Sequence, residues 1–270
     1  MLLEEINKHE LDSRISFVDE GHIYFIDGKS NGIISCTSFI HKFFGQFNAT
    51  QVIQQIQKST KYKTDPTYKY YGKSTQEIKE EWNMTAVLGT KLHYMIELYY
   101  NDLEVEYEED SGFEQFLLFQ QDHESLQIYR TEWRIFDETL KISGSIDAIF
   151  KHKDNTISIY DWKRTPEIVT KSFNNKTARK PINNLLDCNY YHYSLQLNLY
   201  RHILETHYNQ IVKDMFLIVL HPTNTTYQKV EVNRMEPEIQ AILQERKEYL
   251  GSTGTTTGTA TGTEVESLII

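Results

Sequence analysis

Two stretches of the sequence, GSIDAIF at residues 144–150 and SIYDWKR at 158–164, decide the fold. Both are rich in β-branched and aromatic residues, and the turn signal Asp154-Asn155 lies between them, which predicts neighbouring strands over 140–152 and 156–163. A third β-type run, 128–136, precedes them across an Asp137-Glu138 turn. Connections this short predict an antiparallel three-stranded meander.

The second of these stretches ends in a charged pair. Alternate residues of a strand share a face, so Asp161 and Lys163 project together while Trp162 points to the other side. Asp147, on the preceding strand, can approach the same place. An Asp-x-Lys tripeptide alone is more often a surface salt bridge, but this one ends an apolar run, where burying charge is costly unless it is paired or binds a metal. Oxygen ligands of this kind suit Mg²⁺ or Mn²⁺, and a neighbouring lysine can orient a water or stabilise charge on a phosphate.

Helical spacing adds further candidates on either side of the strands. In GTKLHYMIE, within a predicted helix over 86–100, His93 and Glu97 share one face, and His93 can supply an imidazole ligand. The alternative for a single histidine on an apolar face is a hydrogen-bonded core residue. Gln196 and Tyr200 are also four apart, in a helix predicted over 191–206; otherwise they are the polar edge of a packed helix.

The remaining sequence predicts an N-terminal region of strands and helices and a C-terminal tail. We expect residues 1–84 to pack on a catalytic core of residues 85–250, and the Gly/Thr-rich segment 251–270 to be disordered. The other predicted elements are strands at 15–18, 22–27, 215–222 and 227–232, helices at 38–44, from Asn48, from Ser74 or Thr75, at 113–122 and at 235–249, and loops at 61–73 and 165–187.

Composition excludes several classes of protein. Two cysteines in 270 residues exclude a disulfide framework and a four-cysteine zinc or iron–sulfur site. The charged N-terminus and the lack of a long apolar run predict an intracellular protein, neither secreted nor in a membrane. TYKYYGKS at 67–74 lacks the first glycine of a phosphate-binding P-loop, so we expect no nucleotide cofactor.

The net charge of −10 argues against coating of nucleic acid by bulk electrostatics, but the charge is uneven. Residues 58–73 hold five lysines and one aspartate with tyrosines between them, whereas residues 102–114 hold seven acids and no base. Basic segments with aromatic residues suit a strand of nucleic acid, although a charge run is usually only a solvated face.

Taken in order, the motifs GT-x-x-H, G-x-x-D, D-W-K and Q-x-x-x-Y over residues 86–221 resemble the RecB-type branch of the PD-(D/E)XK nuclease superfamily. Its members include mitochondrial genome maintenance exonuclease, CRISPR-associated exonucleases and nucleases of phages and large DNA viruses. The sequence departs from the commoner pattern at Asp161, where glutamate is more usual.

This resemblance implies an α/β, restriction-endonuclease-like core of a helix, the three-stranded meander, a helix and a strand. It also implies that Mg²⁺ or Mn²⁺ binds His93, Asp147, Asp161 and the carbonyl of Trp162, and that Lys163 assists catalysis. Residues that would support the site or hold DNA are Gln196 and Tyr200, with Glu132, Glu97 and Arg164 as secondary candidates.

The expected function is that of a metal-dependent deoxyribonuclease in DNA replication, repair or recombination, an exonuclease preferring single strands or free ends. It would act with replication or repair proteins, in the cytoplasm or at DNA replication sites. The alternatives are a structure-specific or RNA-cutting endonuclease built on the same site, and a catalytically silent nucleic-acid-binding protein. The Asn-, Lys-, Ile- and Tyr-rich composition resembles proteins of AT-rich genomes, including those of large DNA viruses.

Overall fold

The computed structural model describes residues 1–107 and 112–253, and shows a mixed α/β protein. Contacts divide the chain into two compact units. The sheet unit contains Met1–Gly45 and the described residues from Leu92 onward, and the helical unit contains Gln46–Lys91. In the part of the chain that the structure describes, no helix is both long and apolar enough to cross a membrane.

The helical unit contains α3 (Ala49–Lys58), α4 (Thr60–Thr64) and the first part of α5 (Thr75–Tyr100). As predicted, Asn48 caps α3, accepting a hydrogen bond from the backbone of Gln51. The prediction of a loop over 61–73 was partly wrong, because Ser59 caps the short helix α4. The sequence also suggested two helices in the region where the structure has the single helix α5. The helix begins at the reciprocal Ser74–Glu77 capping box and continues as one because no proline interrupts it.

The sheet unit is built on a six-stranded mixed sheet. The predicted antiparallel meander is confirmed, since β5 pairs with both β4 and β6. Strand β7 then runs parallel to β6, and β8 pairs antiparallel with β7. A two-residue strand that the sequence did not indicate, β3, runs parallel to β5. The strands are β3 (Ile34–Ser35), β4 (Gln127–Asp137), β5 (Ile142–Lys151), β6 (Ile157–Lys163), β7 (Val212–Val219) and β8 (Gln228–Glu231).

Strand β5 has a break in pairing along one edge. Its other edge is covered by β4 from residue 142 to residue 151. On the broken edge, β3 pairs with residues 142 and 143, and β6 pairs with residues 148 to 151. Residues 144–147 therefore face no described strand on that edge, and we call them the unpaired segment.

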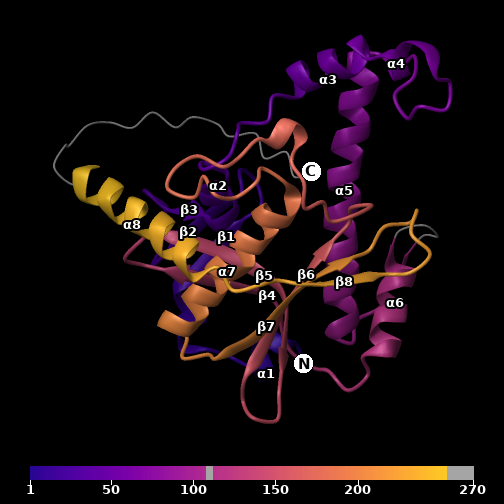
Figure 1. Cartoon of the computed structure of the whole chain (residues 1–270). Coiled ribbons are helices and arrows are strands. Elements are labelled where there is room, and N and C mark those ends of the chain that lie inside the picture. The colour runs from indigo at the N-terminus through magenta and orange to yellow at the C-terminus, as the bar shows by residue number, and fades with distance from the viewer. Residues whose placement is uncertain (108–111, 254–270) are drawn as a thin grey trace. The chain divides into compact units, whose positions relative to one another are not determined.

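Two hydrophobic cores cover the two faces of the sheet. The first contains side chains from α2 (Cys36–His41), α7 (Asn189–His207) and α8 (Glu236–Thr253). The second contains side chains from the sheet-unit part of α5 and from α6 (Phe113–Asp122). Figure 1 shows α7 and α8 on one side of the strands and α6 on the other.

The alternation of faces along β5 shifts within the unpaired segment. Ile142 and Ile146 lie in the first core, whereas Ala148 and Phe150 lie in the second. All four are even-numbered and would share one face of a regular strand. The shift occurs at Asp147, which therefore lies at the boundary between the two faces.

The N-terminal segment is tied to β4. Asp12 accepts hydrogen bonds from Arg130 and from the indole of Trp133. The elements of this region are α1 (Leu3–Ile6), the 3₁₀ helix η1 (Glu10–Arg14), β1 (Ile15–Val18) and β2 (Ile23–Ile26). A second 3₁₀ helix, η2 (Phe173–Asn175), interrupts the predicted loop over 165–187. Helix α8 extends to Thr253, three residues into the predicted tail, and the rest of that tail lies outside the described residues.

Candidate active site

Three side chains that could hold a metal ion meet beside the unpaired segment. They are His93, Glu132 and Asp147, and one ligand atom from each lies within 4.8 Å of the others. They come from α5, β4 and β5, and all are partly buried. The sequence motifs indicated His93 and Asp147, and the fold adds Glu132, which had been a secondary candidate.

Asp147 occupies this position because β5 and β6 separate there. The last paired residues are Ala148 and Tyr160, after which Oδ2 of Asp147 accepts a hydrogen bond from the backbone N–H of Trp162 at 2.8 Å. A side chain thus replaces the next bond of the strand ladder. This bond fixes the carboxylate between the two strands.

Glu132 lies directly opposite Asp147, since Thr131 pairs with Ala148 and Trp133 pairs with Ile146. Its φ of 44° is in the left-handed region, which is unusual for a residue other than glycine and costs on the order of 1–3 kcal/mol. Ser145 donates a hydrogen bond to Oε2 of Glu132 at 2.9 Å. Burial, and then the nearby charge of Asp147, raise the pKa of Glu132 to about 7. The fold therefore holds the carboxyl groups of Glu132 and Asp147 close together, at the cost of a strained backbone at Glu132.

His93 completes the group from the helix side. Its Nε2 lies 2.8 Å from the carbonyl oxygen of Trp162, and its Nδ1 lies 3.4 Å from Oδ2 of Asp147. If Nε2 carries the proton and donates to the carbonyl, the lone pair on Nδ1 faces a carboxylate. That arrangement is favourable only with a second proton or a cation nearby.

Asp161 and Lys163 share a face, as predicted from strand alternation, and form an ion pair of 2.6 Å between Oδ2 and Nζ. Burial raises the pKa of Asp161 to about 6, against the opposing effect of Lys163. Burial acts to lower the pKa of Lys163, but Asp161 and Asp147 outweigh it and raise that pKa. Asp161 thus pairs with the lysine and stays outside the group of three, although its carboxylate is close enough to Asp147 for their charges to interact.

Gln196 and Tyr200 lie on the α7 side of the site. The side-chain amide of Gln196 donates to the hydroxyls of Tyr200 and of Thr37, each at 2.9 Å, which links α7 to α2. The Tyr200 ring is buried against Gly144: a Cβ added to Gly144 would lie 2.6 Å from Cε1 of that ring. The glycine of the G-x-x-D motif is therefore needed for close packing of this helix on β5.

Two secondary candidates lie at the margin of the site. Glu97 follows His93 by one helical turn, and burial raises its pKa. It lies close enough to Glu132 for their charges to interact. Arg164 directly follows β6, and burial lowers its pKa. Neither residue belongs to the group of three, so their supporting roles stay predictions.

Tyr193 is a neighbour of Lys163 that sequence reasoning missed. Nζ of Lys163 lies 4.4 Å from the centre of the Tyr193 ring. A sequence signal existed, because Tyr193, Gln196 and Tyr200 are spaced three and four residues apart and so share one face of α7.

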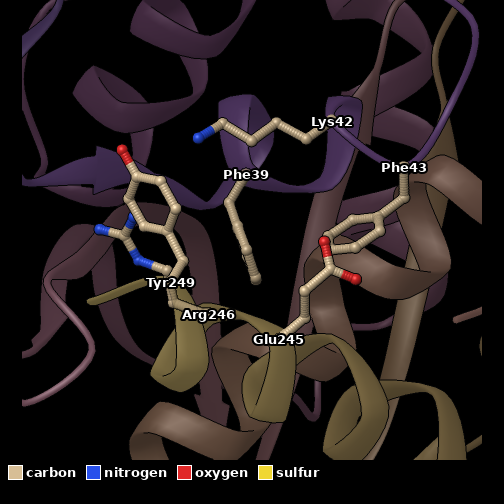
Figure 2. A pocket seen from close by; sticks show the side chains of 6 residues that line it. All are labelled: Phe39, Lys42, Phe43, Glu245, Arg246 and Tyr249. Carbon is tan, nitrogen blue, oxygen red and sulfur yellow. The ribbon is translucent and has the colours of Figure 1, made fainter. Parts of the chain in front are cut away.

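A separate pocket lies between α2 and α8 (Figure 2). The aromatic side chains of Phe39, Phe43 and Tyr249, labelled in Figure 2, line it, and none of the predicted site residues does. The guanidinium of Arg246 donates hydrogen bonds to the carbonyls of Leu140, Gly32 and Lys141, which is a structural role. The lining residues are Phe39, Lys42, Phe43, Glu245, Arg246 and Tyr249.

Comparisons with known proteins give little. No family model matches the chain, and no curated protein matches it. Among solved structures, the crystal structure of SSO0001 is similar at 15% sequence identity and a TM-score of 0.34, with 93% of this chain and 83% of that chain covered. A similarity of this size carries no assignment of fold or function.

Proposed function

We propose that this chain is a metal-dependent nuclease that hydrolyses phosphodiester bonds in DNA. The observation that carries the proposal is the convergence of His93, Glu132 and Asp147 beside the Asp161–Lys163 ion pair. Residues distant in the sequence place an imidazole, three carboxylates and an ammonium group around the point where β5 and β6 separate. Structural ion pairs do not require such crowding of like charges, whereas metal sites do.

The residues present fit Mg²⁺ or Mn²⁺. The imidazole of His93 and the carboxylates of Glu132 and Asp147 would hold the ion, with Asp161 and the Trp162 carbonyl as further ligands. A cation would offset the repulsion between Glu132 and Asp147 and would satisfy the lone pair on Nδ1 of His93. Such an ion supplies Lewis acidity and a water of lowered pKa.

The chain's own groups have separate tasks in this proposal. Lys163, held as an ammonium group by Asp161, would stabilise the negative charge that develops on the scissile phosphate. Asp147 holds β6 at the right distance through the backbone of Trp162. Gln196 and Tyr200 fix α7 against the unpaired segment, so that the site stands on rigid elements.

The finer proposal is a restriction-endonuclease-like core of the RecB-type PD-(D/E)XK branch, acting as an exonuclease on single strands or free ends. The order of the elements that carry the motifs, α5, β5, β6 and α7, supports it, with α6 and β4 between α5 and β5, because the motif residues follow one another along the chain as that core requires. The assignment to DNA replication, repair or recombination belongs to this proposal as well.

The test is degradation of labelled single- and double-stranded DNA by the full chain, with Mg²⁺, Mn²⁺ or a chelator. We expect metal-dependent degradation that Lys163→Ala lowers about 100-fold and that Asp147→Asn or Glu132→Gln removes. The matched controls Lys153→Ala and Glu124→Gln change exposed side chains and should keep full activity. Blocking both ends of the DNA should protect it from an exonuclease. Degradation that survives all three site variants would refute the proposal.

A further inference from the structure

Two groups that differ in kind contact the amine of Lys163. One is the carboxylate of Asp161 at 2.6 Å, and the other is the face of the Tyr193 ring at 4.4 Å. The Lys163 side chain is only 16% exposed, so water cannot replace either neighbour fully. A partly desolvated ammonium group over an aromatic ring is attracted by the ring's negative face.

The ring is held in place by the fold. Tyr193 lies on α7, one turn before Gln196, whose amide links α7 to Thr37 of α2. One turn further along, Tyr200 packs against the backbone of β5. Tyr193 thus extends from a helix anchored at two points of the same face, and only its own two side-chain torsions are left to be fixed.

The Asp161 carboxylate and the Tyr193 ring also differ in whether they would bind the metal. The carboxylate of Asp161 is a metal ligand in the proposed function, and a carboxylate shared with a cation attracts an ammonium group less. The attraction of the Tyr193 ring for the amine does not depend on the metal.

We propose that Tyr193 is a positioning residue for Lys163: its ring holds the ammonium group in the site when the Asp161 carboxylate is engaged elsewhere. This inference rests on the proposed nuclease function. The proposed role belongs to the face of the ring and not to the tyrosine hydroxyl. Tyr193→Phe, which keeps the ring, and Tyr193→Leu, which removes it, should therefore have opposite results.

The experiment compares Tyr193→Phe, which keeps the ring, with Tyr193→Leu, which keeps an apolar side chain without a ring. Tyr190→Leu is the matched control, because the Tyr190 ring packs on Tyr191 instead. With DNA and Mn²⁺, we expect Tyr193→Leu to lower kcat about tenfold or more while KM changes little. Tyr193→Phe and Tyr190→Leu should keep kcat within about twofold.

A second measurement needs no activity. In metal-free protein labelled with ¹³C at the lysine ε-carbon, the Lys163 resonance is assigned by its loss in Lys163→Arg. The ring current of Tyr193 should shift its ε-protons upfield of those of other lysines. That shift should persist in Tyr193→Phe and disappear in Tyr193→Leu, with all variants binding Mn²⁺ equally.

The two measurements separate the possible failures. An unshifted Lys163 resonance in the starting protein, or equal losses of kcat in the Phe and Leu variants, would overturn the role of the ring. A starting protein that degrades no DNA would overturn the proposed nuclease function, and with it the catalytic meaning of the ring, whatever the resonance shows.

Discussion

Substitution of Gly144 by alanine tests the contact that joins α7 to the unpaired segment. The new Cβ would lie 2.6 Å from Cε1 of Tyr200 and 3.1 Å from Sγ of Cys36. Carbon atoms in protein interiors pack at about 3.5–4.0 Å, so at least one neighbour must move. Tyr200 cannot move freely, because its hydroxyl accepts a hydrogen bond from Gln196, which also binds Thr37.

Overpacking of this kind costs about 1–3 kcal/mol. In a chain of this size each kcal/mol lowers Tm by about 2–4 °C, so we expect Gly144→Ala to lower Tm by about 2–12 °C. The matched control is Gly89→Ala, in the interior of α5, where an added Cβ meets nothing within 4 Å. There alanine should stabilise the helix by about 0.5–1 kcal/mol.

The assay is differential scanning calorimetry of both variants and of a double-mutant cycle with Tyr200→Ala. Removing the ring should remove most of the cost of Gly144→Ala, because the two side chains are then no longer in conflict. The packing argument would be refuted if Gly144→Ala unfolds at the same temperature as the parent, or if its cost is equal with and without the Tyr200 ring.

Three further predictions follow from the charged groups. The raised pKa of Glu132 means that the metal-free fold loses stability as pH rises from about 4.5 to about 7. Glu132→Gln should therefore raise the free energy of unfolding by about 2 kcal/mol more at pH 8 than at pH 5, and an equal gain at the two pH values would contradict this. The proton on Glu132 competes with the metal, so the affinity for Mn²⁺ should rise by up to about tenfold per pH unit below pH 7 and level off above it. The assay is the paramagnetic resonance of free Mn²⁺, and an affinity that does not change with pH would show that Glu132 is not a ligand. Burial acts to raise the pKa of Asp12, but hydrogen bonds from Arg130, His9 and Trp133 outweigh this effect and lower that pKa. Asp12 therefore contributes stability above the pKa that it has in the unfolded chain, and this contribution is lost as the pH falls through its lower pKa in the folded protein. Asp12→Asn leaves buried Arg130 without its carboxylate and should cost about 3 kcal/mol in urea unfolding at pH 7, with little cost at strongly acid pH.

The elements with strong local signals were predictable from the sequence. Helix α6 has the predicted bounds, because its apolar residues recur at helical spacing. The meander of β4, β5 and β6 follows from apolar runs joined by short polar turns. Single-residue signals were less decisive. Thus α4 begins at Thr60, directly after its cap Ser59, in a lysine-rich segment that predicts a loop, and α5 continues through residues 83–85, where the sequence suggested a break between two helices.

The candidate site was predictable only in part. Its motif residues could be placed on elements, and Asp161 with Lys163 on one face, because strand alternation is a local property. Glu132 differed, because its place opposite Asp147 depends on the register of two strands and on a left-handed φ that nothing near it in the sequence indicates. The contact of Tyr193 with Lys163 depends on how α7 packs across the sheet.

The sequence by itself determined most of the local structure: which segments other than β3 become strands, where the turns of the meander lie and which side chains alternate along β6. The tertiary structure alone decided that β3 and β6 share one edge of β5 and leave residues 144–147 between them. It also decided that Glu132, Asp147 and His93 meet at this break. The physical reason is that propensity and periodicity act over a few residues, whereas strand register and helix packing are set by contacts between segments far apart in the chain.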